Sequence, residues 1–292
     1  AVGEVAPGLV LDDGRLELTA EADLGDPLLV LRCARVAAEH DAYLQRGSLE
    51  RLADNALPLP VPWPDEAREM FVALLAAGPS AIPVIEDLDH VGLFVLMVPE
   101  WEPCRSRPQR NAYHRFTVDR HLMETAAEAS RLVDRVDRPD LLLVGALFHD
   151  IGKGYPGDHT EVGVDLLRTI ASRMGFDDGD VDILVAMVRH HLLLPDVATR
   201  RDLDDDGTIA SVADALQSGR LLHLLGALTE ADSIATGPSA WSDWKGGLVR
   251  ELVSRVSHVL GGGDVGEVVG GLFPNAEQQA LLDEGGFVAR GE

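Results

Sequence analysis

The chain has 292 residues, 46% of them apolar and 5% aromatic, and its 25 basic against 49 acidic side chains give a formal net charge of −24. That apolar fraction can build one large or two ordinary domains around Leu, Val and Ala, a mix that favours helices, whereas so acidic a body argues against a nucleic-acid substrate. No apolar run reaches membrane-spanning length, and Cys33 and Cys104 lie outside any Cys-x-x-Cys motif, so we expect a cytoplasmic protein with reduced thiols, no zinc ribbon and no membrane partner.

The N-terminal third is predicted to hold a hairpin and several helices. In residues 9–19, apolar residues lie on both sides of an Asp-Asp-Gly turn, which predicts a short β-hairpin. The apolar spacing from Asp26 to Ala56 predicts one helical stretch, and four prolines between residues 58 and 64 predict a loop. Further helices are expected at 65–77, capped by Asp65, and at 80–88.

From residue 117 onward the pattern predicts an all-helical region. The segment 140–151 is apolar nearly all round, which indicates central burial. Asp158 begins an Asp-x-x-Glu capping box, and the helix from Asp180 is expected to stop before Pro195. The remaining helices are predicted at 117–136, 209–216, 220–236, 241–260 and, within a glycine-rich tail, 275–284. The expected fold class is therefore all-α, a helical bundle with at most a small N-terminal β-hairpin.

The candidate chemistry centres on the pair His149-Asp150, which closes the predicted buried helix. A carboxylate there is costly unless it is paired or bound to metal. His121 lies 28 residues upstream, and Asp232 lies on the apolar face of its helix near the C-terminal end, where a negative charge opposes the helix dipole. Two imidazoles and two carboxylates suit a divalent metal (Mn, Fe, Co, Ni, Zn or Mg), which would activate water and polarise a phosphoryl oxygen.

A second group follows the first in sequence. His191 is predicted to face inward and His159 to begin a helix. They either hold a second metal or grip a phosphate beside free backbone N–H groups, with His190 as a substitute for His191; a hydrogen-bonded core histidine is the plain alternative. Lys153, just past the buried helix, could meet a phosphate oxygen or be an ordinary solvated lysine.

Two other features are ambiguous or excluded. Arg200 and Arg201 could bind a phosphate or a partner, or simply form a solvated pair facing the acidic residues 202–206. The run 204–207 resembles half of a calcium loop, but it lacks the closing Glu, which excludes that interpretation.

The order His121, His149-Asp150, Asp232 resembles the HD phosphohydrolase superfamily of all-helical, metal-dependent phosphomonoesterases and phosphodiesterases. Longer strings make the resemblance specific to the central HD region of the bifunctional PII uridylyltransferase/uridylyl-removing enzymes, close over about 98–250. The strings are VPEW (98–101), YHRFTVDRH (113–121), ALFHDIGKG (146–154), GDHTEVG (157–163), VRHHLLL (188–194), TRRDL (199–203) and ADSIATGPSAWSDWK (231–245).

The resemblance implies a domain plan and a partner. In that family a nucleotidyltransferase domain modifies a tyrosine of the trimeric PII signalling protein, the HD domain removes the nucleotide, and ACT domains sense glutamine. The chain has no Gly-Ser followed by Asp-x-Asp and no room for ACT domains after residue 261. We therefore expect a central fragment: a helical connector at 1–97, the HD domain at 98–260 and a linker at 261–292, with glutamine sensing confined to the absent ACT domains.

The implied activity is removal of UMP from nucleotidylated PII. The chain has 23 arginines and only two lysines, a composition that suggests a GC-rich genome. The resemblance then implies AMP as the alternative product, because actinobacterial relatives adenylylate PII. The metal held by His121, His149, Asp150 and Asp232 would activate water, with Asp150 as an alternative base.

Cations would offset the phosphoryl charge, supplied by Lys153 and by Arg200 or Arg201. The competing interpretations are an HD hydrolase of free nucleotides and a non-catalytic connector or PII-binding module.

Overall fold

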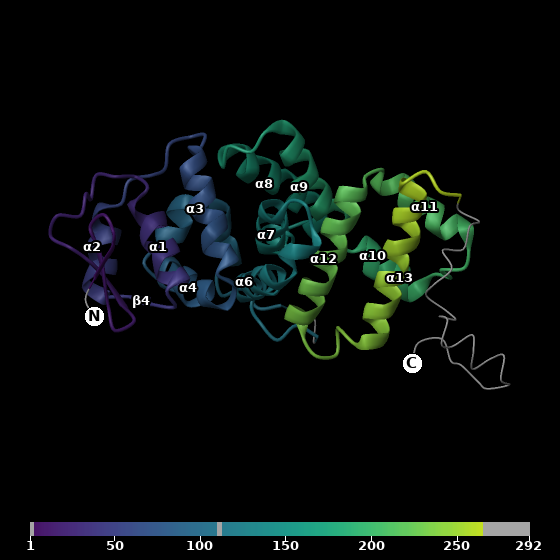
Figure 1. Cartoon of the computed structure of the whole chain (residues 1–292), viewed down its shortest axis with the longest axis horizontal. Helices are drawn as coiled ribbons and strands as arrows, with labels where there is room; N and C mark the ends of the chain where they lie inside the picture. Colours follow the sequence, from purple (N-terminus) through teal and green to yellow (C-terminus); the bar gives the residue numbers. More distant parts are fainter. Residues whose placement is uncertain (1–2, 110–112, 265–292) are drawn as a thin grey trace.

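A computed structural model describes residues 3–109 and 113–264, and these residues form a helical molecule with a small sheet at its N-terminal end. The helices are α1 Leu29–Glu39, α2 Arg46–Asn55, α3 Asp65–Ala76, α4 Ala81–His90, α5 Leu93–Met97, α6 Val118–Ala129, α7 Pro139–Phe148, α8 His159–Arg173, α9 Asp178–His190, α10 Leu193–Arg200, α11 Asp206–Leu216, α12 Gly219–Thr236 and α13 Asp243–Leu260. Short 3-10 helices lie at Gly78–Ser80 (η1), Pro99–Cys104 (η2), Ser130–Arg135 (η3) and Ile151–Gly154 (η4). The elements follow one another along an elongated body, with the sheet at one end and α11 and α13 at the other (Figure 1).

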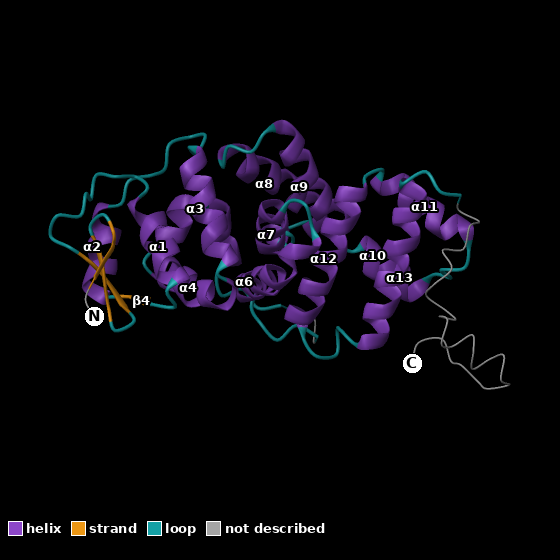
Figure 2. Ribbon diagram, viewed as in Figure 1, coloured by secondary structure: helices purple, strands orange, loops and turns teal. Residues whose placement is uncertain are grey.

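The predicted hairpin is confirmed, but it belongs to a larger sheet. Strands β2 (Leu9–Asp12) and β3 (Arg15–Leu18) pair antiparallel around the Asp-Asp-Gly turn. Strand β1 (Gly3–Ala6) adds to β2, and β4 (Tyr43–Leu44) pairs parallel with β3, giving the order β1-β2-β3-β4. Figure 2 shows the strands confined to the N-terminal end of the molecule, beside α2, and helices making up the rest, which confirms the all-α class with a minor β element.

The stretch expected to be helical from Asp26 to Ala56 does contain helices, but it is divided into two by a short strand. Helix α1 ends at Glu39, Asp41 adopts a left-handed conformation at φ 48°, and the chain then forms β4. A new helix α2 starts after Gln45, whose side chain accepts a hydrogen bond from the Ser48 N–H. Asp65 begins α3 rather than capping it, because Pro64 occupies the N-cap and the Asp65 carboxylate pairs with Arg68 at 2.7 Å.

The expected stop before Pro195 is also wrong. Helix α9 ends at His190, and Pro195 lies in the first turn of α10, where its missing N–H needs no partner. The cap at Asp158 is confirmed, since its carboxylate accepts hydrogen bonds at 3.0 Å from the N–H groups of Thr160 and Glu161. The helix predicted at 275–284 lies outside the described residues.

Helix α7 forms the centre of the core and ends at the candidate site. Residues 141–148 are all buried, and α3, α6, α9 and α12 pack around this helix. Rings join the N-terminal helices to it, because Phe71 stacks on Phe148 at 6.4 Å and Trp101 meets Phe148 edge-on at 6.5 Å. A helix apolar all round and covered on every side presents its polar C-terminal residues from a rigid position.

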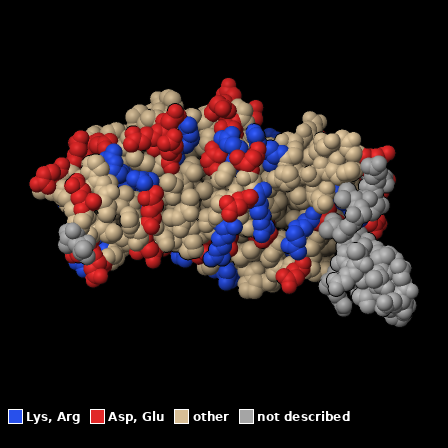
Figure 3. Space-filling view, in the orientation of Figure 1, with Lys and Arg blue, Asp and Glu red and all other residues tan. Residues whose placement is uncertain are grey.

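No single helix among the described residues is long and apolar enough to cross a membrane; only α3 and the following segment Gly78–His90, bent by 110°, meet the length and composition requirement jointly. On the face drawn in Figure 3, Lys and Arg side chains gather mostly in the middle of the molecule, whereas Asp and Glu predominate at the N-terminal end.

Candidate metal centre

Helix ends bring the candidate ligands together. His149 and Asp150 follow α7, His191 follows α9, and His159 is the first residue of α8. His121 lies in the first turns of α6 and Asp232 lies near the C-terminal end of α12. Because α6, α9 and α12 pack on α7, side chains separated by up to 111 positions in the sequence meet at one place.

His121, His149 and Asp232 form the first group of potential metal ligands, with one donor atom from each within 4.8 Å of the others. The Nε2 atom of His121 lies 3.0 Å from Oδ1 of Asp232, and Nε2 of His149 lies 3.5 Å from the same oxygen. Both imidazoles are buried. The structure therefore assembles three of the four ligands predicted for the first metal around one carboxylate oxygen.

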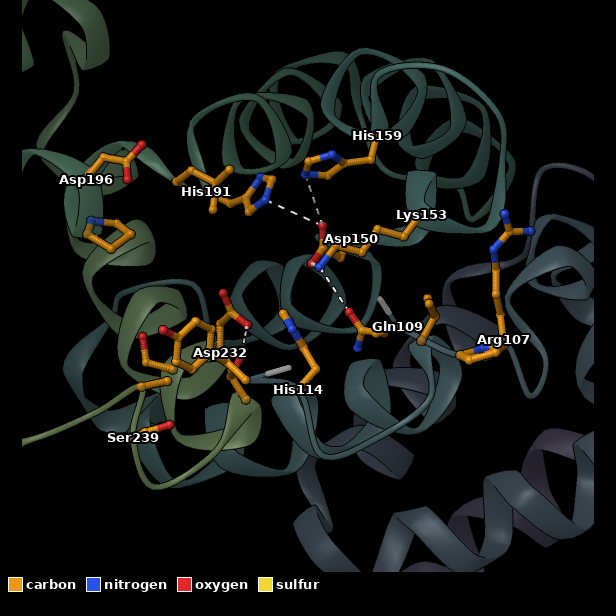
Figure 4. Close-up of a pocket in the computed structure, with 18 of the residues that line it drawn as sticks. Arg107, Gln109, His114, Asp150, Lys153, His159, His191, Asp196, Asp232 and Ser239 are labelled. Carbon is orange, nitrogen blue, oxygen red and sulfur yellow. Dashed lines mark hydrogen bonds and ion pairs between the residues drawn. The ribbon is translucent and has the colours of Figure 1, made fainter. Parts of the chain in front are cut away.

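Asp150, His159 and His191 form the second group. Oδ1 of Asp150 lies 3.7 Å from Nε2 of His159 and 3.6 Å from Nε2 of His191. The other oxygen of Asp150, Oδ2, lies 3.5 Å from Nε2 of His149 in the first group. Asp150 thus stands between the two groups, and Figure 4 shows His159, His191 and Lys153 converging on it.

Backbone hydrogen bonds orient two of the imidazoles. The Nδ1 atom of His149 lies 2.8 Å from the carbonyl oxygen of Ala146, and Nδ1 of His191 lies 2.6 Å from that of Val188. A ring that donates its Nδ1–H to a carbonyl keeps a lone pair on Nε2, which is how metal-binding histidines are commonly held. At the ends of α7 and α9, the Nε2 atoms of His149 and His191 are therefore held in a fixed orientation toward the site.

Several buried polar atoms at the site lack a hydrogen-bond partner in the described part of the chain. They include both ring nitrogens of His121, Nε2 of His149 and His191, Nδ1 of His114 and Oδ1 of Asp150. The short approach of His121 to Asp232 is thus an ion-pair distance without hydrogen-bond geometry. Buried polar atoms left unpaired are costly unless something else satisfies them. Nitrogen and carboxylate donors in this arrangement fit one or two divalent cations.

The electrostatics of the site favour positive charge. Burial alone would keep the His149 ring neutral, but the carboxylates of Asp232 and Asp150 raise the pKa of His149 to about 10. Burial alone would raise the pKa values of Asp150 and Asp232, yet His149 holds both well below the usual range of a carboxyl, helped by Lys153 at Asp150 and by His121 at Asp232. A divalent cation would satisfy the two carboxylates in place of the proton on His149.

The two groups open into a pocket of about 880 Å³. Lys153 lines it, with Nζ 2.5 Å from Oδ2 of Asp150 and 3.3 Å from Oε1 of Gln109. Lys245 and Arg107 also line it, so both lysines of the chain face one cavity in a protein whose net charge is −24. The lining thus places three basic side chains beside three carboxylates, Asp150, Asp196 and Asp232, so it is less acidic than the chain as a whole. Divalent cations bound by the ligand groups would make it suited to an anionic substrate.

Some predicted residues lie elsewhere. Arg200 is exposed and 3.8 Å from Asp196, Arg201 is exposed, and neither lines the described pocket. Among the two adjacent histidines it is His191, not His190, that joins a ligand group. The acidic run after Arg201 serves local structure: Asp205 caps α11, and Asp204 pairs with Arg255 at 2.9 Å.

Other pocket residues were not predicted. His114 lines the cavity, its ring 5.1 Å from that of His121, and burial together with the charges of Lys153 and His121 lowers the pKa of His114 to about 4. Gln109, Arg107 and Lys245 also belong to the lining. His114 and Lys245 fall within the strings that carried the family resemblance, but no spacing rule connects them to the site.

Comparison with known proteins agrees with this geometry. A family model described as HD domain matches residues 118–219, which contain every ligand except Asp232. The chain is 51% identical over 281 residues to the bifunctional uridylyltransferase/uridylyl-removing enzyme of Streptomyces coelicolor, a match covering 96% of this chain and 34% of that enzyme.

Enzymes with the same name from Mycobacterium tuberculosis and Corynebacterium glutamicum are 48% and 37% identical, over 86% and 79% of this chain and 32% and 33% of their own lengths. The chain thus spans about a third of the length of these curated relatives. It contains an HD domain at residues 118–219 and is homologous, over most of its length, to about a third of the bifunctional uridylyltransferase/uridylyl-removing enzymes.

Proposed function

We propose that the chain is a metal-dependent phosphodiesterase that hydrolyses the nucleotidyl-tyrosine bond of modified PII protein and releases UMP, with AMP as the alternative product. The observation that carries this proposal is the shared pocket, in which two His/Asp groups meet both lysines of the chain. The printed name of the relatives, uridylyl-removing enzyme, supports the same chemistry.

His121, His149 and Asp232 would hold one cation, and His159 and His191 a second, with Asp150 between them. A divalent cation bound there lowers the pKa of water and polarises a phosphoryl oxygen. The residues supply the rigid frame for that chemistry, because the backbone carbonyls of Ala146 and Val188 fix the rings of His149 and His191.

Cationic side chains would bind the phosphodiester and offset its negative charge. Lys153 is already at Asp150, and Arg107 and Lys245 approach from other parts of the wall. The Nη1 atom of Arg107 donates a hydrogen bond to the Gly154 carbonyl at 2.8 Å, and Nζ of Lys245 donates one to the Ala240 carbonyl, also at 2.8 Å. These contacts position both cations before substrate arrives, which is how charge stabilisation is most effective.

The pKa values of Asp150 and His114 suit these two residues to different roles. A carboxyl whose pKa lies well below its usual range is a weak proton acceptor, so Asp150 serves better as a cation ligand than as a general base. His114, with a pKa of about 4, is neutral near pH 7 and can share a hydrogen bond with the substrate or the attacking water. Water adds to phosphorus, the bond from phosphorus to the tyrosyl oxygen breaks, and the proton lost by water ends on the phenol.

The domain plan is part of the proposal. Residues 1–97 would connect the catalytic region to further domains, residues 98–260 would form the HD domain, and 261–292 would be a linker. The ring contacts of Phe71 with Phe148 and of Phe94 with Trp101 cross from residues 1–97 to the catalytic region and support a connector that packs closely against it. In this plan the activity is cytoplasmic, and glutamine sensing resides in ACT domains outside the chain.

The test is Mn²⁺-supplemented release of nucleotide from modified PII, with chromatography to identify the product. Asp150→Asn should lose bound metal and abolish release, because Asp150 contacts both ligand groups. Asp182→Asn, at an exposed carboxylate on α9 paired with Arg168, is the matched control and should behave as wild type. Release by Asp150→Asn with metal still bound would refute the assignment, and turnover restricted to free nucleotides would favour the alternative hydrolase.

A further inference from the structure

We infer that the mouth of the pocket is a docking surface for a protein that presents its modified tyrosine on an exposed loop, with Tyr113 and Leu192 as the apolar anchors. This inference rests on the proposed function and specifies how the substrate binds. It distinguishes a protein substrate from a free nucleotide of the same phosphate chemistry.

Two large apolar side chains stand exposed at the pocket. Tyr113 is 64% exposed and Leu192 is 44% exposed, and both line the cavity that holds the ligand groups. They come from different segments, since Tyr113 precedes α6 and Leu192 lies in the turn between α9 and α10. Pro108 and Pro195 extend the apolar lining next to them. Exposed apolar residues that converge on one cavity are typical of an interaction site.

Each anchor adjoins an imidazole of the site. Leu192 directly follows His191, whose ring is buried against Asp150, and Tyr113 directly precedes His114, whose ring contacts His121. At both places the chain passes within one residue from an imidazole that lines the pocket to an exposed side chain, although only the His191 ring is fully buried and His114 is half-buried. A partner that touches the anchors also has its reactive group close to the ligand groups.

The length of a tyrosine side chain requires such contacts. If the phosphorus of a nucleotidyl-tyrosine lies at Asp150, the tyrosine ring extends from it toward the opening, and the backbone that bears the ring follows only a few bonds beyond. The residues flanking that tyrosine must then lie on the mouth of the pocket. A free nucleotide fills the interior and does not extend over the two exposed side chains at the mouth.

The distribution of charge also separates binding of the phosphodiester in the pocket from binding of the protein at its mouth. The pocket lining offers Arg107, Lys153 and Lys245 to the anionic phosphodiester, while the chain as a whole carries a net charge of −24. The overall charge therefore supplies no long-range attraction for an anionic substrate, and the basic side chains of the pocket act on it only at short range. Burial of apolar surface at the mouth supplies affinity that does not depend on charge, and aromatic and aliphatic anchors are the residues that commonly dominate such interfaces.

The test compares two substrates that share the nucleotide and a phenolic leaving group. One is nucleotidylated PII, and the other is the p-nitrophenyl ester of uridine 5′-monophosphate, which has no backbone. For the double variant Tyr113→Ala/Leu192→Ala we expect the ratio of kcat/KM for the protein to kcat/KM for the ester to fall about tenfold, mostly through KM. General damage to the fold or the site lowers both values and leaves the ratio unchanged.

The matched control is Tyr43→Ala/Leu96→Ala, which removes the same two side-chain types at exposed positions outside the pocket lining. Its ratio should equal that of wild type. An unchanged ratio in the pocket variant, with wild type acting on the protein substrate, overturns the docking surface alone. Ester turnover without any release from the protein substrate by wild type rejects both the docking surface and the proposed function.

Discussion

Gly152 occupies a place in which a single added carbon should displace a candidate metal ligand. A Cβ on Gly152 would lie 1.9 Å from the carbonyl oxygen of His159, and 2.8 Å from both the His159 carbonyl carbon and the Gly163 nitrogen. Real Cβ atoms essentially never approach other heavy atoms within 3.0 Å. All three obstacles are backbone atoms of α8, so the η4 segment and the start of α8 must separate by about an ångström in Gly152→Ala.

The expected cost follows from the kind of obstacle. Overpacking typically costs about 1–3 kcal/mol, and a clash with helix backbone belongs at the upper end, so we expect the free energy of unfolding to fall by about 3 kcal/mol. Because His159 itself moves, its Nε2 atom leaves the position 3.7 Å from Asp150. Metal ligands tolerate displacements of only about 0.2 Å, so Mn²⁺ affinity should also fall.

Urea unfolding and Mn²⁺ titration of Gly152→Ala, side by side with Gly247→Ala, measure both effects. Gly247 lies within α13 and its added Cβ would meet nothing within 4 Å, so this control should be stabilised by about 0.5–1 kcal/mol with unchanged metal binding. If Gly152→Ala unfolds like wild type and binds Mn²⁺ equally well, the close packing of η4 on α8 does not position His159.

Two further predictions concern charge. Arg138 joins the starts of α7 and α9 through Asp140 at 2.7 Å and Asp180 at 2.6 Å, so Arg138→Met should lower the free energy of unfolding at pH 7 by about 1–2 kcal/mol in urea. Burial opposes ionisation of Asp140, but Arg138 lowers the pKa of this carboxyl below its usual value. The ion pair therefore stabilises the fold above the unfolded pKa of about 3.9, and this stabilisation is lost as the pH falls further. A difference in stability between Arg138→Met and wild type that stays the same at low pH would contradict this reasoning. The pKa of His149 is raised to about 10, so with EDTA its contribution should be complete below the unfolded pKa of about 6.5 and decline as pH rises toward 10. A pH profile of unfolding identical to that of His149→Gln would contradict that reasoning.

The spacing of apolar residues and the residues at helix ends were enough to predict the local structure of individual helices. The all-round apolar pattern before His149 placed a His-Asp pair at the end of a buried helix, and Asp158 caps α8 as its position indicated. The spacing of His191 to inward-facing residues likewise indicated its burial, which the structure confirms. Each of these inferences depends on residues within two helical turns of one another, where the geometry of a helix leaves few alternatives.

Only the tertiary structure decided which distant residues meet. Asp150 stands between two ligand groups because α8 packs on η4, which follows α7, while α6, α9 and α12 pack on α7 itself, and no sequence spacing reports that arrangement. Arg200 follows the histidines closely in sequence yet points to solvent, whereas Lys245, more than 90 residues after Lys153, shares its pocket. The parallel pairing of β4 with β3 could not be predicted either, because the two strands are distant in the sequence and meet only in the folded protein. Side-chain spacing specifies the face of one helix or strand, but the relative placement of elements comes from how their apolar faces pack together around α7, and that packing places the chemistry.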